Sequence, residues 1–325
     1  MFLMTNYKSR MPYFLKVILL LIGVACAASK SASATISYNN WPQVSGQYLG
    51  QEPPGLTAEI FAPDIISTER SEINSVFTPD GDEFYFTAWT VETGTKIMVT
   101  EQIDGHWTAP RVAPFSKDYS NVDPAISYDG KRMFFGARRP RPGESEIRES
   151  GFDIWFADRN ETGWDEAQYL GPRVNSGDSQ VYATVTHDGT LYFQAIREDS
   201  HGKADIYRSR LVSGVYQIPE NLGPVINSEY YEGDVFIAKD ESYLIVSING
   251  RADSLGGADL YVSFRDTIDS WSPLKNMGSA INSEEREFCP IVTPDGKYLF
   301  FTSKRNGEGD IFWIDAKIIE SLRDQ

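Results

Sequence analysis

Short apolar runs separated by tight-turn signals dominate the chain. In five places an aspartate followed by glycine or glutamate precedes a run of large apolar residues, at residues 84–86, 133–135, 191–193, 244–246 and 299–301. Asp-Gly between two apolar runs is typical of a β-hairpin, because glycine adopts positive φ without a Cβ clash. The pattern therefore predicts many short strands joined by tight turns.

These turns mark five copies of one repeat. Asp80, Asp129, Asp188, Asp240 and Asp295 occupy the turns and recur at intervals of 49 to 59 residues. Each copy continues with a third run, which in four copies opens with Asp and then Ile or Leu. A fourth run ends in Asn-Ser in three copies. Four short strands in about 50 residues are typical of a β-propeller blade, and we expect the repeated turn and third-strand aspartates to be structural.

The ring of blades closes if the two ends of the repeat region share a blade. The last copy ends after its third run, at residues 310–314, while residues 60–67 resemble the missing fourth run. Closure would remove exposed strand edges, which favour aggregation. The sequence therefore predicts an all-β, five-bladed propeller closed by an N-terminal strand. Six blades, one of them degenerate, are the alternative.

One copy carries a recognisable family motif. Residues 293–305 read TPDGKYLFFTSKR and are followed by DIF at residues 310–312. At these residues the chain resembles the WD40-like, or PD40, repeat family and the propeller domain of the TolB family. The resemblance covers residues 57–316 and implies a propeller fold, but it leaves the function open because propellers host binding, scaffolding and catalysis. We expect the chain to lack the α/β domain that precedes the TolB propeller, because residues 35–56 are too few for it.

The N-terminus has the pattern of a secretory signal peptide. Lys8, Arg10 and Lys16 precede an apolar run at residues 17–25, and small residues follow as far as Ala34. The apolar run is shorter than the roughly 20 residues of a membrane span. We expect no integral membrane span in the mature chain. The predicted organisation is a signal peptide at 1–34, a lead-in at 35–56, the propeller at 57–316 and a tail at 317–325.

Export to the periplasm or the medium follows from this segment. Lipidation at Cys26 is an alternative, but the residues before it lack the leucine that usually precedes a lipidated cysteine. After cleavage Cys289 would be the sole cysteine, so the exported domain would contain no intramolecular disulfide.

Charge and motif content exclude several functions. The 46 acidic and 30 basic residues give a formal net charge of −16, whereas a nucleic-acid binder needs a basic surface. The three histidines are far apart in sequence, and neither a phosphate-binding loop nor a dinucleotide fingerprint is present. We therefore assign no catalytic residues and expect no cofactor, apart from a structural divalent cation that Asp123 and Asp234 could hold.

Polar residues recur at the starts of the predicted innermost strands, which should lie at the rim of a central channel. Eight positions before the turn residue stand Glu72, Asn121, Gln180, Glu232 and Glu287. Two positions later stand Asn74, Asp123, Tyr182, Asp234 and Cys289. The second strands end on the same face with Trp89, Arg138, Arg197, Asn249 and Lys304. A concave mouth with acidic, basic and aromatic groups suits a polar ligand, although repeated polar residues can also hydrogen-bond strand ends and loops.

Two functions are compatible with this pattern. The first is an exported, non-catalytic binding or scaffold propeller that recognises a protein or glycan of the cell envelope. The alternative is a carbohydrate-active enzyme of the glycosidase type, which needs two carboxyl groups about 5 to 10 Å apart and could take them from the channel. Its candidate carboxylates would be Glu72, Asp123, Glu232, Asp234 and Glu287.

Overall fold

The structure, a computed structural model, describes residues 41–90, 94–147, 151–267 and 270–323. The signal peptide predicted at residues 1–34 lies outside these ranges. Among the described residues, no helix has the length and apolar character needed to span a bilayer.

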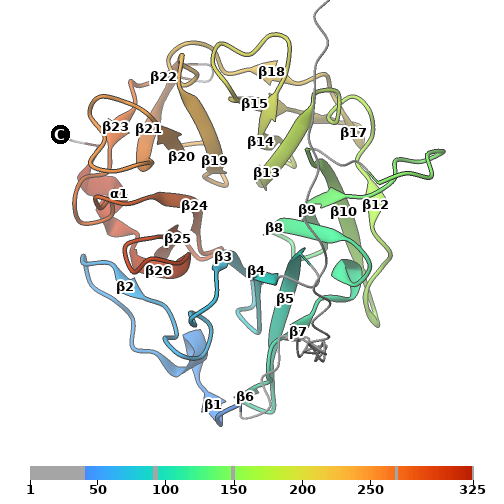
Figure 1. Cartoon of the computed structure of the whole chain (residues 1–325), viewed down its shortest axis with the longest axis vertical. Coiled ribbons are helices and arrows are strands. Elements are labelled where there is room, and N and C mark those ends of the chain that lie inside the picture. Colours follow the sequence, from blue (N-terminus) through green and yellow to red (C-terminus); the bar gives the residue numbers. More distant parts are fainter. Residues whose placement is uncertain (1–40, 91–93, 148–150, 268–269, 324–325) are drawn as a thin grey trace, which may run out of the picture. The chain divides into compact units, whose positions relative to one another are not determined.

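Five antiparallel sheets form the five blades of a propeller (Figure 1). Blade 1 contains β3 (Glu72–Phe77), β4 (Glu83–Thr90), β5 (Gly94–Ile103) and β7 (Arg111–Val112). Blade 2 contains β8 (Ser120–Ile126), β9 (Arg132–Arg138), β10 (Asp153–Asn160) and β12 (Gln168–Tyr169). Blade 3 contains β13 (Ser179–Val185), β14 (Leu191–Ile196), β15 (Asp205–Ser209) and β18 (Glu220–Asn221). Blade 4 contains β19 (Tyr231–Ile237), β20 (Tyr243–Asn249), β21 (Asp259–Thr267) and β23 (Lys275–Asn276). The predicted fold is confirmed.

The fifth blade joins both ends of the propeller. It contains β24 (Glu287–Val292), β25 (Tyr298–Ser303) and β26 (Asp310–Asp315), and its outer strand is β2 (Glu59–Ile60). Glu59 pairs with Trp313 and Ile60 with Phe312. The N-terminal strand therefore closes the ring as predicted, and the six-bladed alternative is wrong.

Smaller elements extend the blades on the outside. The hairpin strands β6 (His106–Trp107), β11 (Gly163–Trp164), β16 (Leu211–Val212), β17 (Val215–Tyr216) and β22 (Ser270–Trp271) follow the third strands. In blade 1, β1 (Val44–Ser45) pairs with β6, so part of the lead-in adds a strand to that blade. Two short turns are η1 (Gln47–Gly50) and η2 (Pro114–Ser116), and the last element is α1 (Lys317–Ser321).

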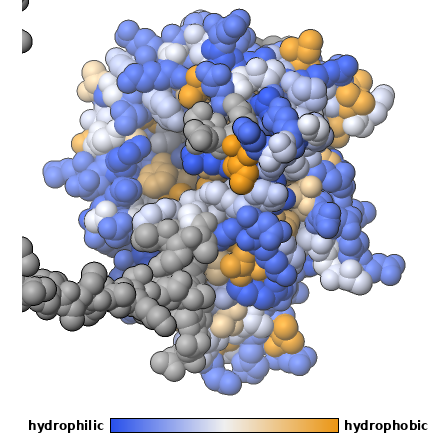
Figure 2. Space-filling model, turned by 45° about the vertical axis from the view of Figure 1, so that its right-hand side comes forward, coloured by the Kyte–Doolittle hydropathy of each residue, from blue (hydrophilic) through white to orange (hydrophobic). Residues whose placement is uncertain are grey.

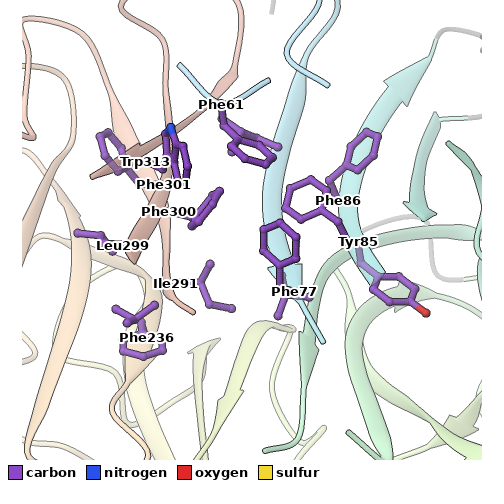
Figure 3. Close-up of a cluster of buried hydrophobic side chains, with 14 of the residues drawn as sticks. Phe61, Phe77, Tyr85, Phe86, Phe236, Ile291, Leu299, Phe300, Phe301 and Trp313 are labelled. Atoms are coloured by element: carbon purple, nitrogen blue, oxygen red, sulfur yellow. The ribbon is translucent and has the colours of Figure 1, made fainter. Parts of the chain in front are cut away.

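Aromatic rings hold the closing segment in place. Phe61, which follows β2, is fully buried and lies 5.0 Å from Phe300 and 5.2 Å from Trp313 between ring centroids. Phe77 of blade 1 packs on the other side, with 6.1 Å between its ring centroid and that of Phe61 (Figure 3). Burial of one such side chain contributes roughly 1.5–3 kcal/mol. The core thus joins the last blade to the first through the segment that closes the ring.

The Asn-Ser motifs fasten blades 2, 3 and 4 to the connections that leave them. Asn227 accepts a hydrogen bond from the Ile206 amide at 2.8 Å and donates to the Ile206 carbonyl at 2.9 Å. Asn282 makes the same pair of bonds to Leu260. At the ring closure the hydroxyl of Ser67 takes this place and accepts from the Ile311 amide at 3.1 Å. These bonds explain why the motif recurs with the blades.

The repeated third-strand aspartates also stabilise loops. Asp259 is fully buried and accepts bonds from the amides of Leu255 and Gly256 at 2.7 and 3.0 Å. The side chain of Asn276 also donates to it, at 2.7 Å. The aspartate therefore shapes the loop of its own blade and does not face a ligand site. The surface seen in Figure 2 is mostly hydrophilic, with apolar residues in separate small groups.

Candidate functional site in the central channel

The innermost strands share an unusual backbone feature. Each contains one residue with φ between 41° and 58°, in the left-handed region, at Asn74, Asp123, Tyr182, Asp234 and Cys289. The pairing register with the second strand shifts at each of these positions, which marks a β-bulge. Left-handed backbone costs a non-glycine residue about 1–2 kcal/mol, and bulges redirect side chains. All five blades thus use this strained conformation at one level of the channel.

Contacts from the preceding blade hold the bulges. Three bulge amides donate to side chains on second strands: Asp123 to Thr87 Oγ1 at 3.2 Å, Asp234 to Gln194 Oε1 at 3.3 Å, and Asn74 to Thr302 Oγ1 at 3.1 Å. Because each bond crosses from one blade to the next, the bulges are part of the packing between blades.

Beyond the bulges the channel becomes apolar. The residues two positions further along the same strands line one small cavity of about 30 Å³. They are Val76, Ala125, Thr184, Phe236 and Ile291. Phe236 and Ile291 lie next to each other in Figure 3. The polar level of the channel therefore lies on the side where the innermost strands begin, which we call the channel mouth.

Two carboxyl groups of the bulge level interact with each other. Asp123 is 9% exposed, and burial together with the charge of Asp234 raises its pKa well above the ordinary value. Burial also raises the pKa of Asp234, although the amide and thiol of Cys289 donate to its Oδ2 at 3.1 and 3.6 Å. The pKa of the Cys289 thiol is raised by burial and by both aspartates. The pair therefore resists carrying two negative charges at once.

Exposed groups surround this pair at the mouth. Tyr231 is 37% exposed, and its hydroxyl accepts a hydrogen bond from Gln194 Nε2. The pKa of Tyr231 is raised first by burial and then by Asp234. Arg286 is exposed, and its charge acts to lower the pKa of Asp234. Trp89 lies near the end of β4 in blade 1, is 51% exposed and stays a predicted contact.

The predicted glutamates are placed differently. Glu72, Glu232 and Glu287 are fully buried and bind the loop that enters their blade. Glu287 accepts from the amide and hydroxyl of Ser283 at 2.8 and 2.6 Å and from Ser303 at 2.7 Å. Glu72 accepts from Thr68 in the same way, and Glu232 accepts from the Ser228 hydroxyl. We therefore correct their assignment as ligand contacts, because these carboxylates are closed off from solvent.

The two amides of that position are also fully buried. Asn121 donates to the Tyr119 carbonyl at 2.6 Å and accepts from Arg139 at 3.2 Å, so it too binds the entering loop. Gln180 has no hydrogen-bond partner for either side-chain atom within the described part of the chain. Neither amide faces solvent, so we correct the assignment of both residues as ligand contacts.

The predicted basic residues lie near the second-strand ends. Arg138 stacks on Phe152, with 4.4 Å from its guanidinium carbon to the ring centroid. Arg197 donates to Ser176 Oγ at 2.6 Å, and Lys304 is half-buried. These three remain predicted ligand contacts.

Sequence reasoning missed a second set of arginines. Arg139, Arg251 and Arg305 stack on the aromatic residues of the third-strand motifs, at 5.5 Å from Trp155, 4.7 Å from Tyr261 and 4.7 Å from Phe312. The recurrence of arginine shortly after the second strand was the available signal. Tyr231 and Arg286 were also missed. Each stands one position before a buried glutamate, and no residue type repeats at that position among the blades that carry the glutamate.

Metal binding at this level stays a prediction. Within the described ranges, no group of three or more His, Cys, Asp or Glu side chains is arranged to hold a metal ion. Asp123 and Asp234 offer two carboxylates, which is fewer oxygen ligands than a protein calcium site normally supplies.

No protein-family model matches the sequence, and no curated protein matches it either. The fold is nevertheless similar to solved propellers. TolB from Acinetobacter baumannii has a TM-score of 0.51 at 16% identity, covering 78% of this chain and 53% of TolB. The catalytic domain of the GH62 α-L-arabinofuranosidase from Coprinopsis cinerea has a TM-score of 0.50 at 10% identity, covering 81% and 97%. The WD40 repeats of RRP9 have a TM-score of 0.45 at 10% identity, covering 82% and 99%.

The similarity to TolB confirms the predicted resemblance to a TolB-type propeller as a matter of fold. The chain spans about half the length of the TolB chain to which it is similar. Identities of this size carry no activity from one protein to another, because one propeller fold supports many functions.

Proposed function

We propose that this chain is an exported, non-catalytic binding or scaffold propeller that recognises a protein segment or a glycan at the channel mouth. The observation that supports this is the contrast between closed and open polar groups. The glutamates that start the innermost strands are buried and bonded to loops, whereas Asp234, Tyr231 and Arg286 remain accessible at the mouth. Concave sites with a few convergent polar groups are the usual form of ligand sites.

The glycosidase alternative loses most of its candidates in this arrangement. Of the five carboxylates considered, Glu72, Glu232 and Glu287 are fully buried, so they cannot approach a sugar. Asp123 and Asp234 remain, and they serve equally well as hydrogen-bond acceptors for a bound ligand. We therefore favour binding over turnover.

Thermal unfolding of the chain against a ligand panel tests the proposal. The panel contains oligosaccharides, cell-wall fragments and peptides, with EDTA and divalent cations as further arms. A ligand that binds the native state at 100 times its Kd should stabilise it by about 2.7 kcal/mol. The matched variants are Trp89→Ala and Tyr231→Ala, and each is compared with its own unfolding without ligand because Tyr231 is hydrogen-bonded to Gln194.

Two results would contradict the proposal. Hydrolysis of a panel ligand by the wild type, abolished in Asp123→Asn, would show an enzyme. A ligand-induced shift that both rim variants leave unchanged would place the site elsewhere on the propeller.

A further inference from the structure

Three hydrogen-bond acceptors at the bulge level lack donors. The carboxylate of Asp123 forms no hydrogen bond or ion pair with any described residue, although the residue is only 9% exposed. The Oδ1 atom of Asn74 is fully buried without a partner, in a residue that is 3% exposed. Asp234 uses Oδ2 for Cys289, and no described group donates to its Oδ1. Unpaired buried acceptors, charged ones above all, are costly to a folded protein.

These acceptors lie at one level of the channel. Asn74, Asp123 and Asp234 occupy the same bulge position in blades 1, 2 and 4, with the same left-handed backbone. Thr302 bonds the Asn74 amide and also contacts the Cys289 thiol, which in turn contacts Asp234. The remaining link is the direct electrostatic interaction between Asp234 and Asp123. The contacts therefore run around the channel from Asn74 to Asp123.

Among the described residues, no basic side chain forms a salt bridge with these acceptors. Arg286 is the basic group whose charge reaches Asp234, yet it is exposed at the rim and forms no salt bridge with either aspartate among those residues. The other two bulge side chains are already satisfied: Tyr182 donates to the Pro290 carbonyl at 2.8 Å, and Cys289 donates to Asp234. The groups without a partner at this level are thus hydrogen-bond acceptors, and a ligand could provide donors to the two carboxylates.

We propose that the channel mouth binds a primary ammonium group of its ligand, and that the carboxylates of Asp123 and Asp234 accept its N–H bonds. The inference rests on the proposed function, since it names the group that the binding propeller recognises. An –NH₃⁺ group offers three donors and no acceptor, which suits two carboxylates that lack donors from the described residues. A divalent metal fits less well, because the described residues provide no set of three ligating side chains. An anion is excluded by the acceptors themselves.

Two sources could present this group: a lysine side chain of a protein or an amino sugar of a glycan. Calorimetric titration at neutral pH and low salt separates them. One arm uses glucosamine trimer with N-acetylglucosamine trimer as its control, and the other uses a lysine-containing peptide with the same peptide acetylated on lysine. We expect the free amine to bind at least tenfold more tightly than its acetylated control in one of the two arms.

Two variants connect the binding to these residues. Asp123→Asn should weaken binding of the free amine at least tenfold while the protein still unfolds cooperatively, because it keeps the shape and removes the charge. Arg286→Gln should tighten binding two- to fivefold, because it removes a competing cation from the rim. If Asp123 had only a structural role, Asp123→Asn would leave the affinities for the free amine and for its acetylated control unchanged.

Several results would overturn the inference. Equal binding of free and acetylated ligands, or no binding of either amine, excludes ammonium recognition. Binding of Ca²⁺ that disappears in Asp123→Asn would assign the pair to a metal. If acetylated ligands bind and the rim variants weaken them, the proposed function survives without this inference. If no ligand's binding changes in Trp89→Ala or Tyr231→Ala, the proposed function and this inference both fail.

Discussion

Two rings of polar residues, two positions apart on the same five strands, have opposite roles in this propeller. Glu72, Glu232 and Glu287 are fully buried and hydrogen-bonded to the loop that enters their blade. Asp123 is almost as deeply buried but has no partner for its carboxylate in the described structure. Burial therefore does not distinguish Asp123 from these glutamates, whereas the presence of donors to the carboxylate does.

The largest expected effect is the loss of a carboxylate from the structural ring. Glu287→Ala removes the acceptor of the half-buried Ser283 and the buried Ser303 and leaves their donors unpaired. We expect the free energy of unfolding to fall by about 3–5 kcal/mol, as when one partner of a buried charged network is removed. Urea unfolding measures it, with the exposed Glu284→Ala as control. A loss below about 1 kcal/mol, the value of one ordinary hydrogen bond, would remove the distinction between the rings.

The corresponding change in the aspartate pair should have the opposite sign. Asp123→Asn relieves a buried carboxyl whose pKa is raised by burial and by Asp234. We expect the free energy of unfolding at neutral pH to rise, because the native state no longer holds a buried carboxyl whose ionisation it disfavours. Urea unfolding beside Glu287→Ala gives the comparison directly. Destabilisation by Asp123→Asn would place the aspartate in the structural ring.

The pH dependence of stability sharpens the same contrast. The folded pKa values of Asp123 and Asp234 lie above the unfolded ones. At pH values between the unfolded and folded pKa values, the native state therefore binds more protons than the unfolded state. Their contribution to stability is therefore greatest at low pH and falls as the pH rises from about 4 through the folded pKa values. For each proton, the free energy of unfolding falls by at most about 1.4 kcal/mol when the pH rises by one. The groups around the pair are Tyr182, Cys289, Tyr231 and Arg286.

Other carboxyl groups titrate in the opposite direction. Hydrogen bonds from Ser127 and Thr186 lower the pKa values of the turn residues Asp129 and Asp188, so their stabilisation is lost as pH falls through the folded pKa. Comparing the unfolding of the wild type and Asp123→Asn between pH values of about 4 and 8 cancels these contributions, because both proteins share them. We expect the difference between the two proteins to grow with pH, and a constant difference would contradict the raised pKa.

The smallest effect concerns one donor of the structural ring. Ser283→Ala removes a 2.6 Å bond to Glu287 but leaves the amide bond and the Ser303 bond in place. We expect a loss of about 1 kcal/mol in the free energy of unfolding, measured by urea unfolding. The same loss as in Glu287→Ala would mean that one hydroxyl accounts for the whole contribution of the glutamate.

The fold could be predicted from the sequence because each blade repeats its turn residues and its apolar runs. The missing fourth strand after residues 310–314 and its counterpart near Ile60 were both recognisable in the residue pattern, and the structure pairs them. Phe61 and Ser67 then complete the blade through contacts that any outer strand of this repeat would need.

The candidate site could be predicted only in part. Strand periodicity places Glu72 and Asn74 on one face, two positions apart, and so assigns both to the channel. A β-bulge at Asn74 breaks that alternation and turns the two side chains to different surroundings. The bulge leaves no signature in residue type, because Asn, Asp, Tyr and Cys all occupy it. Which acceptors remain without donors is decided by contacts between blades, such as Thr302 with Asn74, which lie far apart in sequence.

We propose that the aspartate pair of the channel mouth serves ligand binding and not folding, and one measurement tests this most directly. It is a calorimetric titration of the wild type and Asp123→Asn with the two amine ligands and their acetylated controls. We predict that a free amine binds the wild type and binds the variant at least tenfold more weakly. Equal affinity for the two proteins would contradict a ligand-binding role for the pair.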